Sequence, residues 1–84
     1  MTSAWLTSKT AAEVRKRYSA TIEAAIAGAR ETRERVTVEA SDGAEAYAFP
    51  HKQGRIVWGV NEAKTGVNIL RGVRRPDGQD EAVG

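Results

Sequence analysis

The sequence predicts a two-layer α+β protein, with one long N-terminal helix packed on a four-stranded antiparallel meander of two hairpins. Three observations predict this fold. Residues 10–33 carry an apolar stripe with helical spacing, alternation of apolar and polar residues begins after Arg35, and glycine-containing turns separate the later segments. A helix and a sheet that each have one apolar face bury those faces against each other.

The helix is expected to run without interruption through residues 10–33. Thr10 and Glu13 have the spacing of a capping box, in which each side chain satisfies a free backbone amide of the first turn. The stripe keeps its phase through residues 16–18, which favours a single helix over two. Its members are Ala11, Val14, Tyr18, Ile22, Ala25, Ile26 and Ala29.

The first hairpin is expected to turn at Asp42-Gly43, a strong signal for a two-residue loop. Such a loop pairs Val38 with Tyr47 and Val36 with Phe49. The apolar residues of both strands then share the buried face.

The second hairpin is expected to join residues 55–62 to residues 67–74 through a four-residue turn. In that register Trp58 lies opposite Arg71, which suggests a cation–π pair. We expect residues 1–76 to form a single domain and residues 77–84 to be a flexible acidic tail.

The charge distribution suggests either an anionic partner or a tail that covers basic surface of the same chain. The 84 residues include 13 basic and 11 acidic ones, for a net charge of +2. Three of the acids, Asp77, Asp80 and Glu81, lie in the predicted tail, so the remainder of the chain is more basic than the whole.

The sequence argues against an enzyme and implies no cofactor or metal. It has no cysteine, and its one histidine, His51, lies in a polar turn. Ser41 and Asp42 are residue types that a hairpin turn selects, and no nucleophile, base and orienting group can be assembled. Without a long apolar run or a secretion signal, the expected location is the cytoplasm of a bacterium or a phage-infected cell.

Protein–protein contact is the function we expect first. A four-stranded sheet covered by one helix leaves its outer face and two edges open to a partner protein or a second copy. A phage or prophage accessory protein, such as an inhibitor of a host machine or a virion assembly adaptor, would suit this size. The interface residues we expect are Val57, Leu70, Thr37, Asn61, Asn68 and Trp5.

Nucleic-acid binding is the alternative, because the basic residues fall into three groups that could contact phosphates. The predicted contacts are Arg15, Lys16, Arg17, Arg30, Arg33, Arg71, Arg74 and Arg75. Tyr47, Phe49 and Trp58 are assigned to the core, so no platform for stacking bases is expected.

A second form of this alternative comes from residues 5–14 (WLTSKTAAEV) and 20–26 (ATIEAAI). Together they resemble the start of excisionase-like, MerR-type helix-turn-helix domains. The resemblance implies a first helix at residues 10–15 and a second, at residues 19–29, that enters the major groove of DNA. It covers less than a third of the chain.

Overall fold

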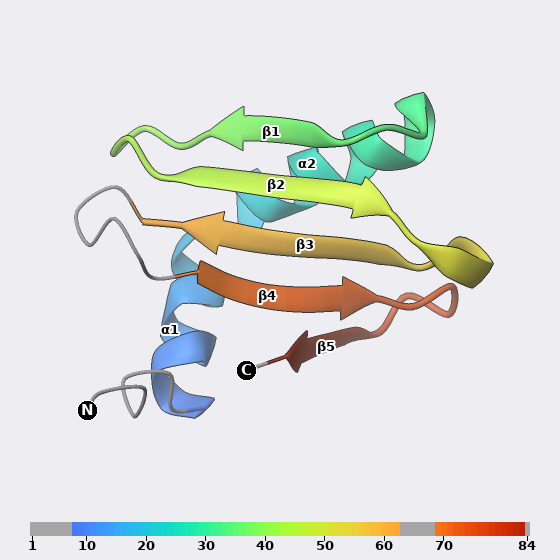
Figure 1. Ribbon diagram of the computed structural model, residues 1–84. Coiled ribbons are helices and arrows are strands. Elements are labelled where there is room, and N and C mark those ends of the chain that lie inside the picture. Colours follow the sequence, from blue (N-terminus) through green and yellow to red (C-terminus); the bar gives the residue numbers. More distant parts are fainter. Residues whose placement is uncertain (1–7, 63–68, 84) are drawn as a thin grey trace.

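Five antiparallel strands form one sheet with both helices on the same side of it (Figure 1), in a computed structural model that describes residues 8–62 and 69–83. The strands are adjacent in chain order, from β1 to β5. The α+β class and the antiparallel sheet are therefore as predicted. The elements are α1 (Ser8–Arg17), α2 (Ser19–Thr32), β1 (Val36–Glu39), β2 (Glu45–Pro50), the 3-10 turn η2 (Lys52–Gly54), β3 (Ile56–Asn61), β4 (Ile69–Arg74) and β5 (Asp80–Val83).

The prediction of one long helix is wrong, because the chain bends at Tyr18. This residue has φ −108° and ψ 20°, outside the helical range, and α1 and α2 run in different directions on either side of it (Figure 1). The backbone hydrogen bonds from Tyr18 to Val14 (3.0 Å) and from Ile22 to Tyr18 (2.8 Å) persist across the bend. Tyr18 is only 5% exposed, so the apolar stripe continues in phase although the helix axis turns.

The first hairpin has a three-residue loop, so the predicted register is wrong by one residue. The amide of Ala40 donates to Ala44 O (2.8 Å) and that of Gly43 to Ala40 O (3.1 Å), with Gly43 at φ 92°. This is a turn followed by a residue in the left-handed backbone conformation, which glycine adopts readily. Val36 consequently pairs with Ala48, and Thr37 with Tyr47.

The second hairpin also differs from prediction by one residue, because Trp58 lies opposite Gly72 rather than Arg71. A Cβ atom at position 72 would lie 2.0 Å from Cζ2 of the Trp58 ring. Only glycine leaves room for the indole at that position, and this requirement selects the register. The cation over the Trp58 ring is instead Arg15, with Cζ 5.8 Å from the ring centroid.

A fifth strand corrects the expected count of four, and it is formed by Asp80–Val83 from the predicted tail. Its turn repeats the geometry of the first hairpin: the Gly78 amide donates to Arg75 O (2.9 Å) and the Arg75 amide to Gln79 O (3.0 Å), with Gly78 at φ 91°. Ser41-Asp42-Gly43 and Pro76-Asp77-Gly78 thus form the same kind of loop.

The core lies between α2 and the middle of the sheet, and small residues on both sides bring the two layers close. Ala25 and Ala29 of α2 and Ala46 and Ala48 of β2 are 0–1% exposed. Among the residues whose burial is described, Trp58 supplies the largest fully buried side chain. The other buried hydrophobic residues of that set are Tyr18, Ile22, Ile26, Ala44, Ile56 and Val60.

Candidate binding surface

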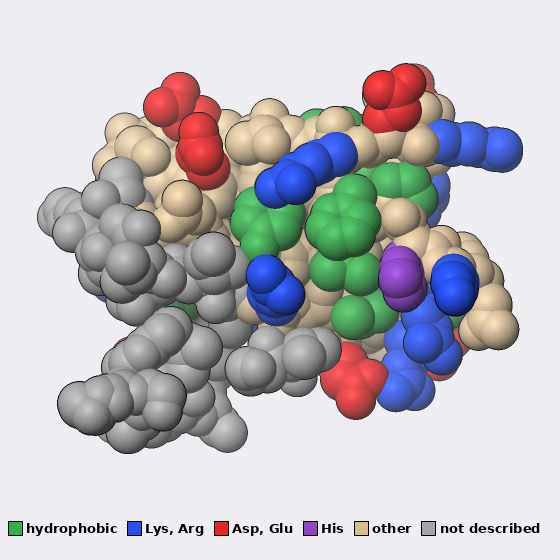
Figure 2. All heavy atoms as spheres, in the orientation of Figure 1, with side chains coloured by type: hydrophobic (Ala, Val, Ile, Leu, Met, Phe, Trp, Pro, Cys, Tyr) green, Lys and Arg blue, Asp and Glu red, His purple; other side chains and the backbone are tan. Residues whose placement is uncertain are grey.

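The side of the sheet away from the helices carries the aromatic side chains Tyr47 and Phe49. The hairpin register brings Ala46 and Ala48 to the helix side, and alternation then directs the residues between and after them to the open side. Figure 2, which views this side, shows hydrophobic side chains gathered at its centre with Lys and Arg side chains beside them. The assignment of Tyr47 and Phe49 to the core is therefore wrong.

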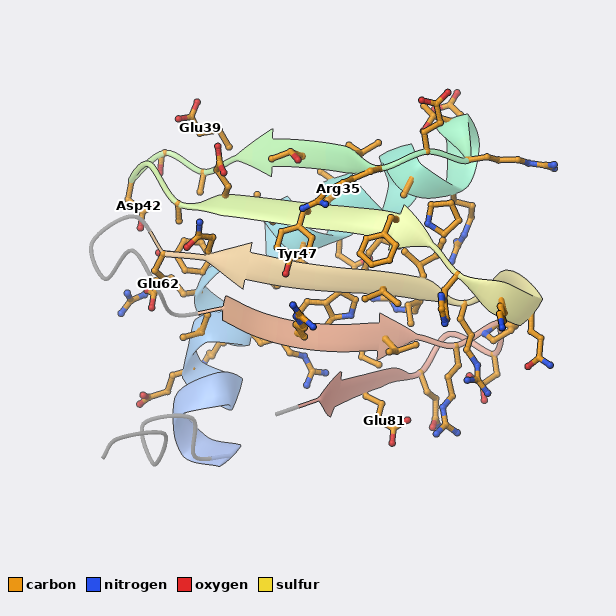
Figure 3. All side chains as sticks on the ribbon, in the orientation of Figure 1. Arg35, Glu39, Asp42, Tyr47, Glu62 and Glu81 are labelled. Atoms are coloured by element: carbon orange, nitrogen blue, oxygen red, sulfur yellow. The ribbon has the colours of Figure 1, made fainter. Side chains whose placement is uncertain are left out.

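A hollow of about 210 Å³ lies on this face, and we call its lining the aromatic patch: Arg35, Tyr47, Phe49, Val57 and Arg71. Arg35 Cζ lies 4.9 Å from the ring centroid of Tyr47 and 6.0 Å from that of Phe49. Figure 3 shows the Arg35 side chain extended over the Tyr47 ring. Val73, paired with Val57, continues the apolar surface onto β4.

Four of the eight basic residues predicted to contact phosphates are in ion pairs within the chain. Arg74 bonds to Asp80 and Glu23, and these contacts raise its pKa further above its usual range. Arg75 bonds to Glu81. Arg15 Nη2 lies 3.8 Å from Asp80 Oδ2, and Arg17 Nη1 lies 3.7 Å from Glu62 Oε2. Two acids of the expected tail, Asp80 and Glu81, thus pair with basic side chains of the same chain.

The other four predicted cations, Lys16, Arg30, Arg33 and Arg71, form no ion pair within residues 8–62 and 69–83. Arg71 belongs to the aromatic patch. Arg30 and Arg33 lie at the C-terminal end of α2, where they line a second hollow with Arg55. Lys16 is exposed on α1.

The predicted protein-interface residues are only partly brought together. Val57 and Thr37 lie on the open face. Asn61 is on the same face, because every second residue of β3 from Val57 onward points to that side. The Asn61 Oδ1 atom is buried without a hydrogen-bond partner in the described part of the chain. Leu70 pairs in register with the buried Val60, and its side chain is not among those described. Asn68 and Trp5 lie outside the described residues.

Tyr18 joins the helix bend to the first hairpin at one end of the sheet. Its hydroxyl donates to Asp42 Oδ2 (2.6 Å) and makes a longer contact with Glu62 Oε2 (3.4 Å), and Figure 3 shows these two acids at the same end. The bond to Asp42, followed by burial, raises the pKa of Tyr18. The same bond and the Ala44 amide, which donates to Asp42 Oδ1 (3.0 Å), lower the pKa of Asp42.

Tyr18 and Asp42 thus have a structural role, since Asp42 both accepts from the hydroxyl of the buried Tyr18 ring and closes the turn through the Ala44 amide. His51 precedes η2 and is exposed. Within the described ranges, no three His, Asp or Glu side chains are grouped so that they could hold a metal ion. None of the described helices is both long enough and apolar enough to cross a membrane.

In comparisons with known proteins, no family model, no curated protein and no solved structure matched this chain.

The residues that sequence reasoning missed are the two rings, whereas Arg71 beside them was already among the predicted phosphate contacts. Tyr47 and Phe49 were assigned to the wrong face of the sheet because the first hairpin loop is one residue longer than predicted. The alternation of alanines at positions 44, 46 and 48 was the available signal, because small residues allow a helix to approach a sheet closely.

Proposed function

We propose that this chain is a non-catalytic binding module that takes single-stranded nucleic acid on the aromatic patch. The observation that carries the proposal is the position of Tyr47 and Phe49 beside Arg35 and Arg71 on the uncovered side of the sheet. Aromatic rings that stack on bases, combined with cations that contact phosphates, are the usual means of binding single strands.

The spacing of the rings favours a single strand over a duplex. Tyr47 and Phe49 are two residues apart in β2, which places their side chains about 7 Å from each other along the strand. This distance is roughly twice the 3.4 Å rise between stacked bases. Each ring can therefore hold one base of an unstacked strand, whereas paired bases in a duplex keep their faces covered. Arg35, which lies over Tyr47, would stack on the incoming base or move to a phosphate.

Binding of double-stranded DNA through α2 has less support. The bend at Tyr18 divides the helices near the position that the helix-turn-helix resemblance implies. The face of α2 left exposed by the sheet, however, consists mainly of alanine and glutamate, and Glu23 is engaged by Arg74. A helix that reads the major groove needs arginine, lysine, asparagine or glutamine on that face.

Binding of a labelled thymidine oligomer and of a matched duplex, measured at low and at high salt, tests the proposal. We expect the single strand to bind more tightly than the duplex, with affinity falling steeply as salt is added. The Y47T/F49T double variant keeps β-forming residues on an exposed face and should lose about tenfold or more in affinity, because stacking contributes about 1–3 kcal/mol per base.

Lys16→Gln is the matched control, since it removes an exposed cation on the helix side of the molecule and should reduce affinity far less. No binding of the single strand at low salt would overturn the proposal. Equal affinity of Y47T/F49T and the wild type would also overturn it.

Protein–protein contact is the second candidate, favoured by the apolar pair Val57 and Val73 beside the two rings. An apolar and aromatic centre with arginines beside it is typical of protein interfaces. If a second copy is the partner, sedimentation should show a dimer that Val57→Lys dissociates. A wild-type chain that is monomeric at every concentration would exclude this form.

A further inference from the structure

A second surface, distinct from the aromatic patch, is a hollow of about 450 Å³ at the end of the molecule where α2 finishes and β2 turns into β3. We call it the basic end pocket. Arg30, Arg33, His51 and Arg55 supply its polar lining, while Ala29 and Ile56 supply apolar lining.

The backbone explains why these side chains meet. Arg33 has left-handed φ 61° and ψ 25°, and its amide donates to Ala29 O (2.8 Å), which ends α2. Arg30 lies one helical turn earlier, on the same side of the helix. Across the pocket, the His51 amide donates to Arg55 O (2.7 Å), so these two residues leave the turn side by side.

The charge of this pocket is uncompensated. No Asp or Glu side chain lines it, and no ion pair engages its three arginines within the described ranges. Arginines near the end of a helix are stabilised by the helix dipole, but that end carries only about half a negative charge against three positive ones. Glu31 and Glu34 belong to the same stretch of chain but do not line the pocket.

We propose that the basic end pocket binds a phosphate group. Guanidinium groups pair with phosphate oxygens through two parallel hydrogen bonds, and three of them around one hollow match a phosphate dianion better than a carboxylate. The rest of the molecule that carries the phosphate would lie against the apolar lining, Ala29 and Ile56. This inference does not depend on the aromatic patch, because it uses only residues of the pocket.

The phosphate has two possible sources, a nucleic-acid strand or a free phosphorylated small molecule. The pocket adjoins the aromatic patch along the chain, since Pro50 of the pocket follows Phe49, and Arg33 precedes Arg35 by two residues. A strand that lies on the patch and continues past the Phe49 end of β2 would therefore reach the pocket.

The test is an NMR titration of the full chain with inorganic phosphate, in which the chemical shifts of the backbone amides are followed. Chloride at the same ionic strength is the comparison. We expect saturable shifts at residues 33 and 51–55 that chloride does not produce. Arg55→Gln and Arg33→Asn should each weaken binding about tenfold, because each removes a charge-assisted contact. Asparagine tolerates the left-handed conformation at position 33, so the second variant keeps the fold.

Lys16→Gln is again the control and should bind phosphate like the wild type. Identical shifts with phosphate and chloride would overturn the proposal, as would unchanged affinity in both arginine variants. Because this assay contains no nucleic acid, it can succeed where the nucleic-acid proposal fails.

Titration with a thymidine oligomer and with thymidine monophosphate then identifies the source. Shifts at the pocket with the oligomer assign a strand phosphate. Shifts with the monophosphate alone assign a small molecule. Binding of neither, despite a response to inorganic phosphate, would limit the site to an adventitious ion only and overturn its proposed role.

Discussion

Gly72 shows how one missing side chain determines a strand register. The Trp58 ring occupies the space where any other residue at position 72 would place its Cβ, and Trp58 is fully buried. Because cores are packed to crystal-like density, the indole cannot move aside without displacing its neighbours.

Gly72→Ala should therefore lower the free energy of unfolding by about 2 kcal/mol or more, the upper range for overpacking a core. Chemical denaturation of the purified variant measures this loss. In a Trp58→Phe background the clashing ring atoms are absent, so adding Gly72→Ala should cost less than in the wild type. A full, additive loss in the double variant would contradict this explanation.

Tyr18 and Asp42 should make the stability depend on pH at both extremes. The pKa of Asp42 is lowered in the folded state, so its contribution is present above about pH 4 and lost as pH falls through the folded value. The pKa of Tyr18 is raised, so its contribution is present below about pH 10 and lost as pH rises further.

Tyr18→Phe should make the free energy of unfolding depend less on pH at both the acidic and the alkaline end. Chemical denaturation at a series of pH values measures this. Asp42→Asn should remove the acidic part in the same way. If Tyr18→Phe follows the wild-type curve throughout, the hydrogen bond does not link the helix bend to the hairpin.

At the scale of elements, β5 is held by charge as well as by backbone pairing. The side chains of Arg74 and Asp80 are only 15% and 17% exposed, so their ion pair is shielded from water. The pair of Arg75 and Glu81 has side chains 48% and 56% exposed and is screened by solvent and salt.

Asp80→Asn should consequently lower the unfolding free energy by about 1 kcal/mol, at the upper end for pairs near a surface. Glu81→Gln is the matched control and should change it by less than about 0.5 kcal/mol. Thermal denaturation of the two variants side by side distinguishes them. Equal effects would show that burial of the Arg74 pair contributes nothing.

The two Asp-Gly loops show how local sequence acts at this scale. In both, an aspartate oxygen accepts the amide two residues later, from Ala44 (3.0 Å) and from Gln79 (3.1 Å). The second loop was predictable from the same dipeptide as the first. It was missed because the strand after it, Asp80–Val83, has two charged residues and little apolar alternation.

For the whole molecule, acidic side chains gather at one end of the strands, whereas the other end carries the arginines of the basic end pocket, unpaired within the described residues, together with Glu31, Glu34 and Asp77. Asp42 and Glu62 lie at the end where Tyr18 anchors the first hairpin, and Glu39 pairs with Glu45 near that end. The basic end pocket lies at the opposite end of β2. An anionic chain on the open face therefore meets attraction at one end and repulsion at the other, which would give it a preferred position.

The sequence alone determined the α+β class, the antiparallel sheet and the apolar stripe of the helical segment, because periods of 3.6 and 2 residues appear in the chain itself. Only the tertiary structure decided the bend at Tyr18, the registers and the number of strands. Each depends on contacts between residues far apart in the chain: Tyr18 with Asp42, Trp58 with Gly72, and Arg15 with Asp80. Because side chains alternate with a period of two, a loop one residue longer was enough to move Tyr47 and Phe49 from the expected core to the open face.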